Sequence, residues 1–332
     1  MDHELRERYF QALENEIIML MDPDTGLVSD TYTRLIDCPL CHKGPEDNEH
    51  LFDKNGFTFV RCQCCGFIFT NPQVNSDLLG DLYRHADSSQ LWVELQKSAT
   101  EQAWKTDYYL DAIRVIEMHL RAEAPPRLLD IGCNTGLFLE VAREHRPQWR
   151  LKGVELNAGA CEYARSRGLD VDDVLLSDMD RSEVFDMYTL FGVMEHLPEP
   201  HGILEDIKNR VLPGHEAMIM AIVPNSYSLY HMLLQERSVS FDGRNHLLYF
   251  SEETLCRVFE EHGYELLLLD TVLDGLGNIR RQMQWFDPNG GNNSDRFLPE
   301  SLRALFDNGT IATLIRQYNL GLRLRILARY CA

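Results

Sequence analysis

The stretch Leu128-Leu-Asp-Ile-Gly-Cys-Asn-Thr-Gly136 predicts a short buried strand that runs into a glycine turn and then into a helix. Small residues at such a turn let the backbone approach a bound ligand closely. Backbone amides at the start of the following helix favour an anionic group such as a carboxylate. Glu155 ends the next predicted strand, where an acidic side chain accepts hydrogen bonds from both hydroxyls of a ribose. The stretch therefore predicts a site for a nucleotide-like ligand.

Strands and helices alternate from this turn onward. The predicted strands cover residues 127–131, 151–155, 169–174, 185–191, 216–223 and 264–270, and the predicted helices cover 135–145, 158–167, 200–211 and 252–262. Residues 322–329 begin with alternating apolar and basic side chains, which predicts a last strand at the edge of the sheet. The pattern indicates an α/β fold, with a Rossmann-like, mostly parallel seven-stranded sheet and helices on both of its faces.

Three later stretches carry further motifs. Asp178 follows the third predicted strand, the fourth ends in Glu195-His196-Leu197, and residues 245–251 read Asn-His-Leu-Leu-Tyr-Phe-Ser. Together with the glycine turn, these motifs resemble the class I S-adenosylmethionine (SAM)-dependent methyltransferases over roughly residues 100–330. Asn134 stands where that family usually has a middle glycine. The turn lacks Gly-x-Gly-x-x-Gly, which argues against NAD, and it lacks Gly-Lys-Ser/Thr, which excludes a P-loop.

This resemblance implies that SAM is the cofactor and that methyl transfer is the reaction. It places Asp178 beside the amino group of the adenine and the glycine turn beside the rest of the cofactor. The implied cofactor-binding residues are Asp130, Gly132, Cys133, Gly136, Glu155, Leu156, Asp178, Met179, Phe191 and Gly192.

Five of the nine cysteines fall between residues 38 and 65. Two Cys-x-x-Cys pairs at this separation are typical of a zinc ribbon, in which four thiolates surround the metal at ~2.3 Å. We assign Cys38, Cys41, Cys62 and Cys65 as ligands. Four thiolates leave no open coordination position, so the predicted zinc is structural. Residues 61–72 resemble the N-terminal zinc module of some sugar and natural-product methyltransferases.

Two histidines are candidates for a base that takes a proton from the methyl acceptor, because histidine titrates near neutral pH. His196 follows the fourth predicted strand, at the carboxyl edge where ligands bind in open α/β sheets. His246 lies in the segment 225–250, which we expect to fold over the entrance for the acceptor. We prefer His246 as the base and expect His196 to support the cofactor. A purely structural hydrogen-bonding role stays open for each.

The chain of 332 residues has a formal net charge of −20. Such an acidic surface repels a phosphate backbone and argues against a nucleic-acid partner. The longest apolar run, residues 217–223, is far shorter than the ~20 residues of a membrane helix, and the first residues lack a signal-peptide pattern. We therefore expect a cytoplasmic protein without a membrane partner.

Four regions are expected. They are an N-terminal helix and connector (1–36), the zinc ribbon (37–74), a helical lead-in (75–124) and a SAM-binding domain (125–332) with inserted lid segments at 225–250 and 272–300. The preferred interpretation is methyl transfer to oxygen or carbon of a small molecule, a sugar or a secondary metabolite. Two alternatives stay open. One is a nucleic-acid or protein methyltransferase that docks through the zinc ribbon, and the other is a non-catalytic SAM-binding module. No pattern indicates the oligomeric state.

Overall fold

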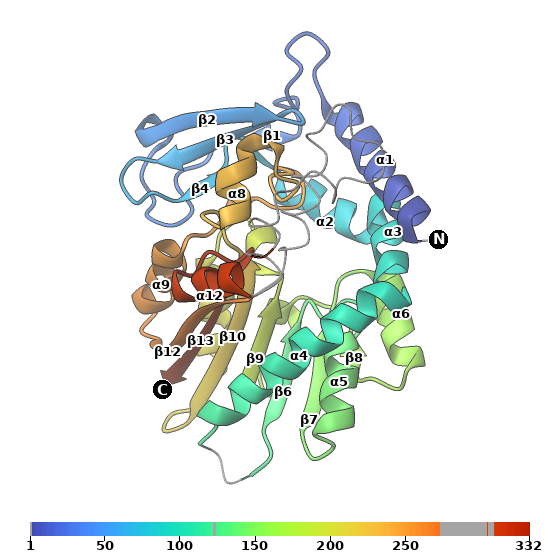
Figure 1. Ribbon diagram of the computed structural model, residues 1–332, viewed down its shortest axis with the longest axis vertical. Helices are drawn as coiled ribbons and strands as arrows, with labels where there is room; N and C mark the ends of the chain where they lie inside the picture. The colour runs from blue at the N-terminus through green and yellow to red at the C-terminus, as the bar shows by residue number, and fades with distance from the viewer. Residues whose placement is uncertain (1, 122–123, 273–303, 305–308) are drawn as a thin grey trace.

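A seven-stranded sheet forms the centre of the C-terminal part of the chain. The computed structural model describes residues 2–121, 124–272, 304 and 309–332 (Figure 1). The strands are β6 (Arg127–Ile131), β7 (Arg150–Val154), β8 (Val171–Asp172), β9 (Met187–Phe191), β10 (Glu216–Pro224), β12 (Glu265–Val272) and β13 (Arg323–Cys331). Their order is β12-β13-β10-β9-β6-β7-β8, and only β13 runs antiparallel to its neighbours. The predicted Rossmann-like, mostly parallel sheet is confirmed.

Helices cover both faces of this sheet, because successive strand residues point to opposite sides. Leu128 and Met187 belong to a core that they share with α4 (Ala99–His119), α5 (Leu137–His145) and α6 (Ala158–Ser166). Their chain neighbours Leu129 and Tyr188 belong to a second core, which contains α7 (His201–Lys208) and α9 (Glu252–Glu261). The helix α12 (Thr310–Gln317) contacts β12 near the edge of the sheet.

The N-terminal part of the chain forms helices and a second sheet. The helix α1 (Asp2–Leu20) packs against α3 (Asp87–Gln96), which follows α2 (Ser76–His85). The short strands β1 (Thr33–Arg34) and β5 (Gln73–Val74) pair antiparallel. Between them lie η1 (Pro45–Asp47) and the antiparallel strands β2 (Asn48–Lys54), β3 (Phe57–Cys62) and β4 (Ile68–Thr70). The buried rings of Phe57 and Phe59 fix the inward face of β3.

The second sheet takes its fourth strand from a distant part of the sequence. The strand β11 (Leu248–Tyr249) pairs antiparallel with β4, so the order is β11-β4-β3-β2. The amide of Thr70 also donates a hydrogen bond to the carbonyl of Leu247 at 3.0 Å. The preceding residues form α8 (Leu229–Leu234) and η4 (Gln235–Arg237). The segment 225–250, which we expected as a lid, is therefore anchored at its end to the N-terminal sheet.

The prediction that the last strand lies at the edge of the sheet is wrong. β13 lies between β10 and β12, and β12 forms the edge. Two of the three arginines of this strand, Arg325 and Arg329, are buried and form ion pairs, while Arg323 is half-buried against the rings of Trp104 and Tyr108. Nη2 of Arg325 lies 2.5 Å from Asp270 and its Nη1 lies 2.6 Å from Asp111, and Arg329 has Glu216 at 3.4 Å. Acidic partners therefore allow arginines to lie in an inner strand of the sheet.

Other boundaries differ by a few residues. The helix expected from residue 135 begins at Leu137, because Gly136 still has left-handed backbone angles, and the third strand is only Val171–Asp172. The expected inserted segment 272–300 lies outside the described residues, except that Val272 ends β12. Within the described ranges, every helix is too short or too polar to cross a membrane.

Candidate active site and metal centre

The turn after β6 has the backbone that a close-approaching ligand needs. Gly132, Asn134 and Gly136 have φ angles of 68°, 50° and 77°. A β-carbon on Gly132 would lie 2.7 Å from Cγ2 of Val193, and one on Gly136 would overlap Cδ1 of Leu169. Glycine is therefore required at both positions, while asparagine tolerates the left-handed region at 134. The departure from the family pattern at Asn134 leaves the turn intact.

Glu155 holds this turn from the end of β7. Its Oε2 accepts a hydrogen bond from the amide of Asn134 at 2.9 Å. Its Oε1 accepts hydrogen bonds from the amides of Leu156 and Asn157, both at 2.8 Å. Burial raises the pKa of the carboxyl group, and these three amides oppose that shift by stabilising the anion. Glu155, which is predicted to bind a ribose, thus also joins the turn after β6 to the loop after β7.

Asp130 lies beneath the turn and is 3% exposed. Its Oδ1 accepts a hydrogen bond from the hydroxyl of Thr189 on β9 at 2.6 Å. Burial raises the pKa of Asp130 to about 7, an effect that the hydrogen bond from Thr189 partly offsets. A carboxyl group in this environment is charged only near and above neutral pH.

The other predicted cofactor residues lie along the same carboxyl edge of the sheet. Cys133 and Met179 are buried, Leu156 and Phe191 are half-buried, and Asp178 and Gly192 are exposed. Asp178 ends η2 (Leu176–Asp178), and Phe191 ends β9. The ring of Phe191 stacks on Tyr109 of α4, with ring centroids 5.6 Å apart. The aromatic part of α4 thus packs against this edge.

His196 and His246 come together beside Glu195, although they are far apart in sequence. Glu195 and His196 belong to η3 (Met194–His196), which follows β9, and His246 precedes β11. The two imidazole rings have centroids 4.8 Å apart. Nε2 of His196 lies 4.0 Å from Oε1 of Glu195, and the carbonyl of Glu195 accepts a hydrogen bond from the amide of Leu247 at 2.8 Å. This backbone hydrogen bond from Leu247, the residue before β11, to Glu195 of η3 therefore joins the predicted cofactor edge to the segment that carries His246.

The hydrogen bonds of both histidines determine their tautomers. Nδ1 of His196 contacts the carbonyl of Asn245 at 2.8 Å, and Nδ1 of His246 contacts the carbonyl of Ser240 at 2.9 Å. A carbonyl oxygen only accepts, so each Nδ1 carries a hydrogen, and in the neutral ring the lone pair is on Nε2. Burial lowers the pKa of His196 to about 3, which keeps that ring neutral.

Two residues of this site had no signal in the sequence. The ring of Tyr83, on α2, lies edge-on to His196 with centroids 5.7 Å apart, and its hydroxyl is buried without a hydrogen-bond partner among the described residues. Burial raises the pKa of Tyr83, and the nearby carboxylates of Asp242, Glu195 and Glu155 add to that shift. Oδ1 of Asp242 accepts hydrogen bonds from the amides of Asn245 and His246 at 2.7 and 3.1 Å. Tyr83 is therefore close to His196 and also to Glu155 of the predicted cofactor site.

The four predicted zinc ligands lie together at the end of β3, which Cys62 terminates. Sγ of Cys38 lies 3.6 Å from Sγ of Cys65, and Sγ of Cys41 lies 3.5 Å from Sγ of Cys62. Four sulfurs bound at ~2.3 Å in a tetrahedron are separated by about 3.8 Å, so the observed spacing fits zinc. Burial raises the pKa of Cys41 to about 11. The surplus Cys64 is exposed.

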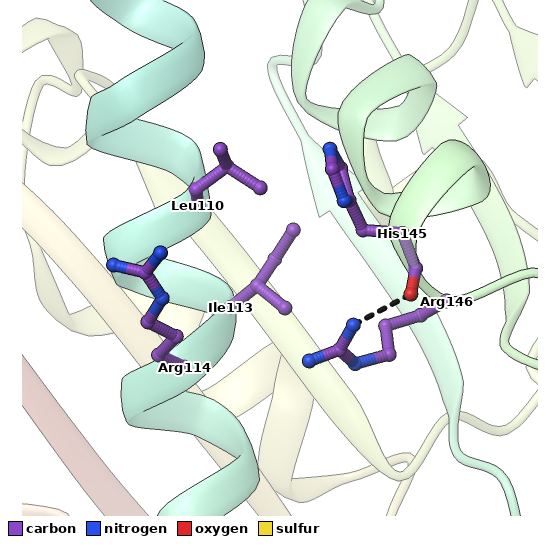
Figure 2. Close-up of a pocket in the computed structure, with 5 residues that line it drawn as sticks. All are labelled: Leu110, Ile113, Arg114, His145 and Arg146. Atoms are coloured by element: carbon purple, nitrogen blue, oxygen red, sulfur yellow. Dashed lines mark hydrogen bonds between the residues drawn. The ribbon is translucent and has the colours of Figure 1, made fainter.

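A hollow elsewhere on the molecule contains none of the predicted site residues. Figure 2 shows it between α4 and α5, lined by Leu110, Ile113, Arg114, His145 and Arg146. The guanidinium of Arg146 donates to the carbonyl of His145 at 2.6 Å. These side chains come from the middle of α4 and the end of α5, away from the turn after β6.

Comparison with known proteins identifies the fold's family. Residues 105–269 match the model of a methyltransferase domain family. The chain contains a methyltransferase domain with a Rossmann-like sheet. This match confirms the predicted methyltransferase and supports SAM as its cofactor, while the residues that hold SAM stay predictions.

Curated relatives match part of this methyltransferase. A ubiquinone biosynthesis O-methyltransferase of Neisseria meningitidis serogroup C is 26% identical over 117 residues, which are 32% of this chain and 49% of the relative. A protein of the same name from Erwinia tasmaniensis is 24% identical over 160 residues, which are 45% of this chain and 63% of the relative. The methyltransferase therefore spans less than two thirds of the length of these relatives.

Solved structures of low identity also resemble the methyltransferase. A SAM-dependent methyltransferase from Archaeoglobus fulgidus is 17% identical with a TM-score of 0.45, and covers 77% of this chain and 100% of its own. The plantazolicin methyltransferase BpumL, in complex with a pentazolic desmethylPZN analog and SAH, is 14% identical with a TM-score of 0.48. That match covers 77% of this chain and 95% of the other.

Proposed function

We propose that this methyltransferase transfers the methyl group of SAM to a small-molecule acceptor. The observation that carries the proposal is the position of His196 and His246 beside the predicted cofactor edge. One ring nitrogen of each histidine lies within 4.8 Å of a carboxylate oxygen of Glu195, three residues beyond Gly192. In-line transfer from a sulfonium needs an acceptor aligned with the methyl group and, for a hydroxyl or an acidic carbon, a group that takes its proton. His246 supplies that group in this proposal, and His196 supports the cofactor side.

SAM occupies the carboxyl edge of β6, β7 and β9 in this proposal. The glycine turn accommodates the amino-acid end, because two left-handed glycines leave room for a close approach. Glu155 accepts the ribose hydroxyls with the lone pairs that its three amide bonds leave. The remaining residues proposed to surround SAM are Asp130, Cys133, Leu156, Asp178, Met179, Phe191 and Gly192.

A small acceptor, such as a sugar or a secondary metabolite, is supported by two observations. The net charge of −20 disfavours a nucleic-acid substrate. The curated relatives are named for methylation in ubiquinone biosynthesis, the modification of a small molecule. We also propose that Cys38, Cys41, Cys62 and Cys65 hold one structural zinc ion, since their sulfur spacing fits a tetrahedral site.

Calorimetry with SAM tests the cofactor side. Glu155→Ala removes a charged hydrogen-bond acceptor, which costs about 1.5–3 kcal/mol, or about 10- to 150-fold in the dissociation constant. Glu162→Ala, on the exposed face of α6, is the matched control and leaves the affinity unchanged. Equal SAM affinity in Glu155→Ala and the control would show that the cofactor lies elsewhere.

Transfer of label from methyl-labelled SAM tests the acceptor side. The protein is incubated with a protein-free metabolite extract and, in parallel, with RNA and with a denatured protein mixture. We expect label in small molecules only. Label in RNA or protein would favour docking of a macromolecule through the zinc ribbon. SAM binding without any transfer would favour a non-catalytic module.

A further inference from the structure

One carboxylate and two imidazoles converge at the acceptor side of the site. Glu195, His196 and His246 each offer one donor atom, and these atoms lie within 4.8 Å of one another. Glu195 is 3% exposed, and its Oε2 is buried without a hydrogen-bond partner among the described residues. An ionised carboxylate that is buried without a partner is strongly disfavoured. A cation between the three side chains would supply the missing partner.

The orientation of the two histidines matches that of metal ligands. A histidine that binds a metal through one ring nitrogen almost always donates its other N–H to a carbonyl or a carboxylate. Here both Nδ1–H groups are donated to backbone carbonyls, those of Asn245 and Ser240. These bonds fix both rings and leave Nε2 free for a cation. The backbone of His246 is itself fixed, because Asp242 accepts its amide hydrogen and Tyr249 donates to its carbonyl at 2.7 Å.

We propose that Glu195, His196 and His246 bind one divalent first-row cation. Two neutral imidazoles and one carboxylate are the nitrogen and oxygen ligands that such ions take. Donors bonded to one ion at about 2.1 Å are about 3.0 Å apart when adjacent, so donor atoms that now lie within 4.8 Å of one another approach by at most about 1.8 Å, or about 0.9 Å for each side chain. This centre is chemically distinct from the four thiolates of the second sheet, which prefer zinc.

A cation held by three protein ligands keeps open positions for an oxygen of the acceptor. This role rests on the proposed methyl transfer and deepens it, because the cation then replaces His246 as the group that activates the acceptor hydroxyl; binding of the cation itself does not depend on methyl transfer. The bound hydroxyl loses its proton to water, since the cation lowers its pKa. The oxygen lone pair then forms the bond to the methyl carbon while the carbon–sulfur bond breaks, and its electron pair stays on sulfur as the sulfonium charge is neutralised. The acceptor class is thus a molecule with an ionisable hydroxyl group.

Binding of Mn²⁺, followed by the electron paramagnetic resonance of the free ion, tests the proposal. The full chain, with its zinc in place, is dialysed against metal-free buffer and titrated with Mn²⁺. We expect one site per chain. Loss of an outer-shell partner weakens metal sites by about 10- to 100-fold, so loss of a ligand in His246→Ala or Glu195→Gln weakens this one by at least about 100-fold. His145→Ala, at the end of α5, is the matched control and leaves Mn²⁺ binding unchanged.

The outcomes separate this proposal from the proposed function. The variants are first shown to keep SAM affinity and thermal unfolding near those of the unmodified protein, so a loss of Mn²⁺ binding is not a loss of fold. Mn²⁺ binding that His246→Ala and Glu195→Gln abolish supports the centre even if no methyl transfer is found. No Mn²⁺ binding, or binding that both variants retain, overturns the centre. In that case transfer by metal-free protein would still support His246 as the base.

Discussion

His196 and His246 differ in what positions their backbone. His196 ends η3, five residues after β9 of the sheet that carries the predicted cofactor site. His246 reaches the same point because Asp242 holds its amide and β11 pairs with β4. The two side chains meet, yet we expect their loss to disturb different parts of the proposed site.

Replacement of each histidine by alanine separates the two roles. His246→Ala should lower turnover by about 10²–10⁴-fold, the usual cost of losing a group that handles the acceptor proton. It should leave SAM affinity nearly unchanged, whereas His196→Ala should weaken SAM binding as well. Calorimetry and the labelled-SAM assay measure the two effects. Wild-type turnover in His246→Ala would remove that residue from the mechanism.

Asp130 gives the stability of the protein a definite dependence on pH. Its pKa rises from 3.8 in an ordinary environment to about 7 in the fold. The folded chain therefore binds a proton that the unfolded chain has lost between these two values, and stability falls as the pH rises through that window. Asp130→Asn keeps an acceptor for Thr189 but cannot ionise. It should be more stable than the unmodified protein at pH 8 by at most about 4 kcal/mol, and by much less at pH 4.

Denaturant unfolding at both pH values, without SAM, measures this difference. Asp173→Asn is the control, since Asp173 is exposed and Arg165 lowers its pKa. A difference between Asp130→Asn and the unmodified protein that does not grow with pH would show that the carboxyl group titrates normally.

Among the secondary-structure elements, the strands of the parallel sheet could be predicted and the position of β13 could not. β6, β9 and β10 are apolar runs buried on both faces, and this pattern is local to each run. Arg325 and Arg329 of β13 have their partners at Asp111, Asp270 and Glu216, which the sequence does not associate with them. Their pattern is the same for a solvent-facing edge and for buried ion pairs. β11 could not be predicted for a similar reason, because it has only two residues and its partner β4 lies far away in the sequence.

Removal of one zinc ligand should disturb the second sheet. Purified protein should contain about one zinc per chain, and Cys38→Ser or Cys65→Ser should lose it and unfold at a lower temperature, because metal binding contributes folding energy. Cys64→Ser is the control, as its side chain is exposed and surplus to the four ligands. Because β11 pairs with β4, the ligand variants should also lose turnover. Zinc content that is unchanged in Cys38→Ser would exclude this ligand set.

Across the whole molecule, a buried ion pair joins α1 to the segment that carries His246. Oε2 of Glu16 lies 2.5 Å from Nη2 of Arg244, whose side chain is 2% exposed. Glu16 also accepts hydrogen bonds from the amide and the hydroxyl of Ser88 on α3, at 2.8 and 2.7 Å. One carboxylate therefore joins two N-terminal helices to the segment that carries His246. Sequence periodicity places Glu16 on a helix but does not indicate this partner.

Glu16→Ala leaves Arg244 buried without its counter-charge. The loss of one partner of a buried pair costs about 3–5 kcal/mol, so the midpoint of denaturant unfolding should fall accordingly. Glu14→Ala, on the exposed side of α1, should change the free energy of unfolding by less than about 0.5 kcal/mol. In Arg244→Met combined with Glu16→Ala, part of the lost stability should return. Equal stability of Glu16→Ala and Glu14→Ala would show that the pair contributes little.

The pairing of β11 with β4 also governs what happens when the chain is divided. A fragment that ends near residue 75 keeps β2, β3 and β4 but loses the strand that covers the outer side of β4. Such an uncovered strand presents free amide and carbonyl groups to other copies, which is the usual start of edge-to-edge aggregation. The complementary fragment keeps Leu247, Leu248 and Tyr249, all buried in the intact protein, with nothing to cover them. We therefore expect each fragment to be poorly soluble when expressed alone, and co-expression of the two to restore solubility to both.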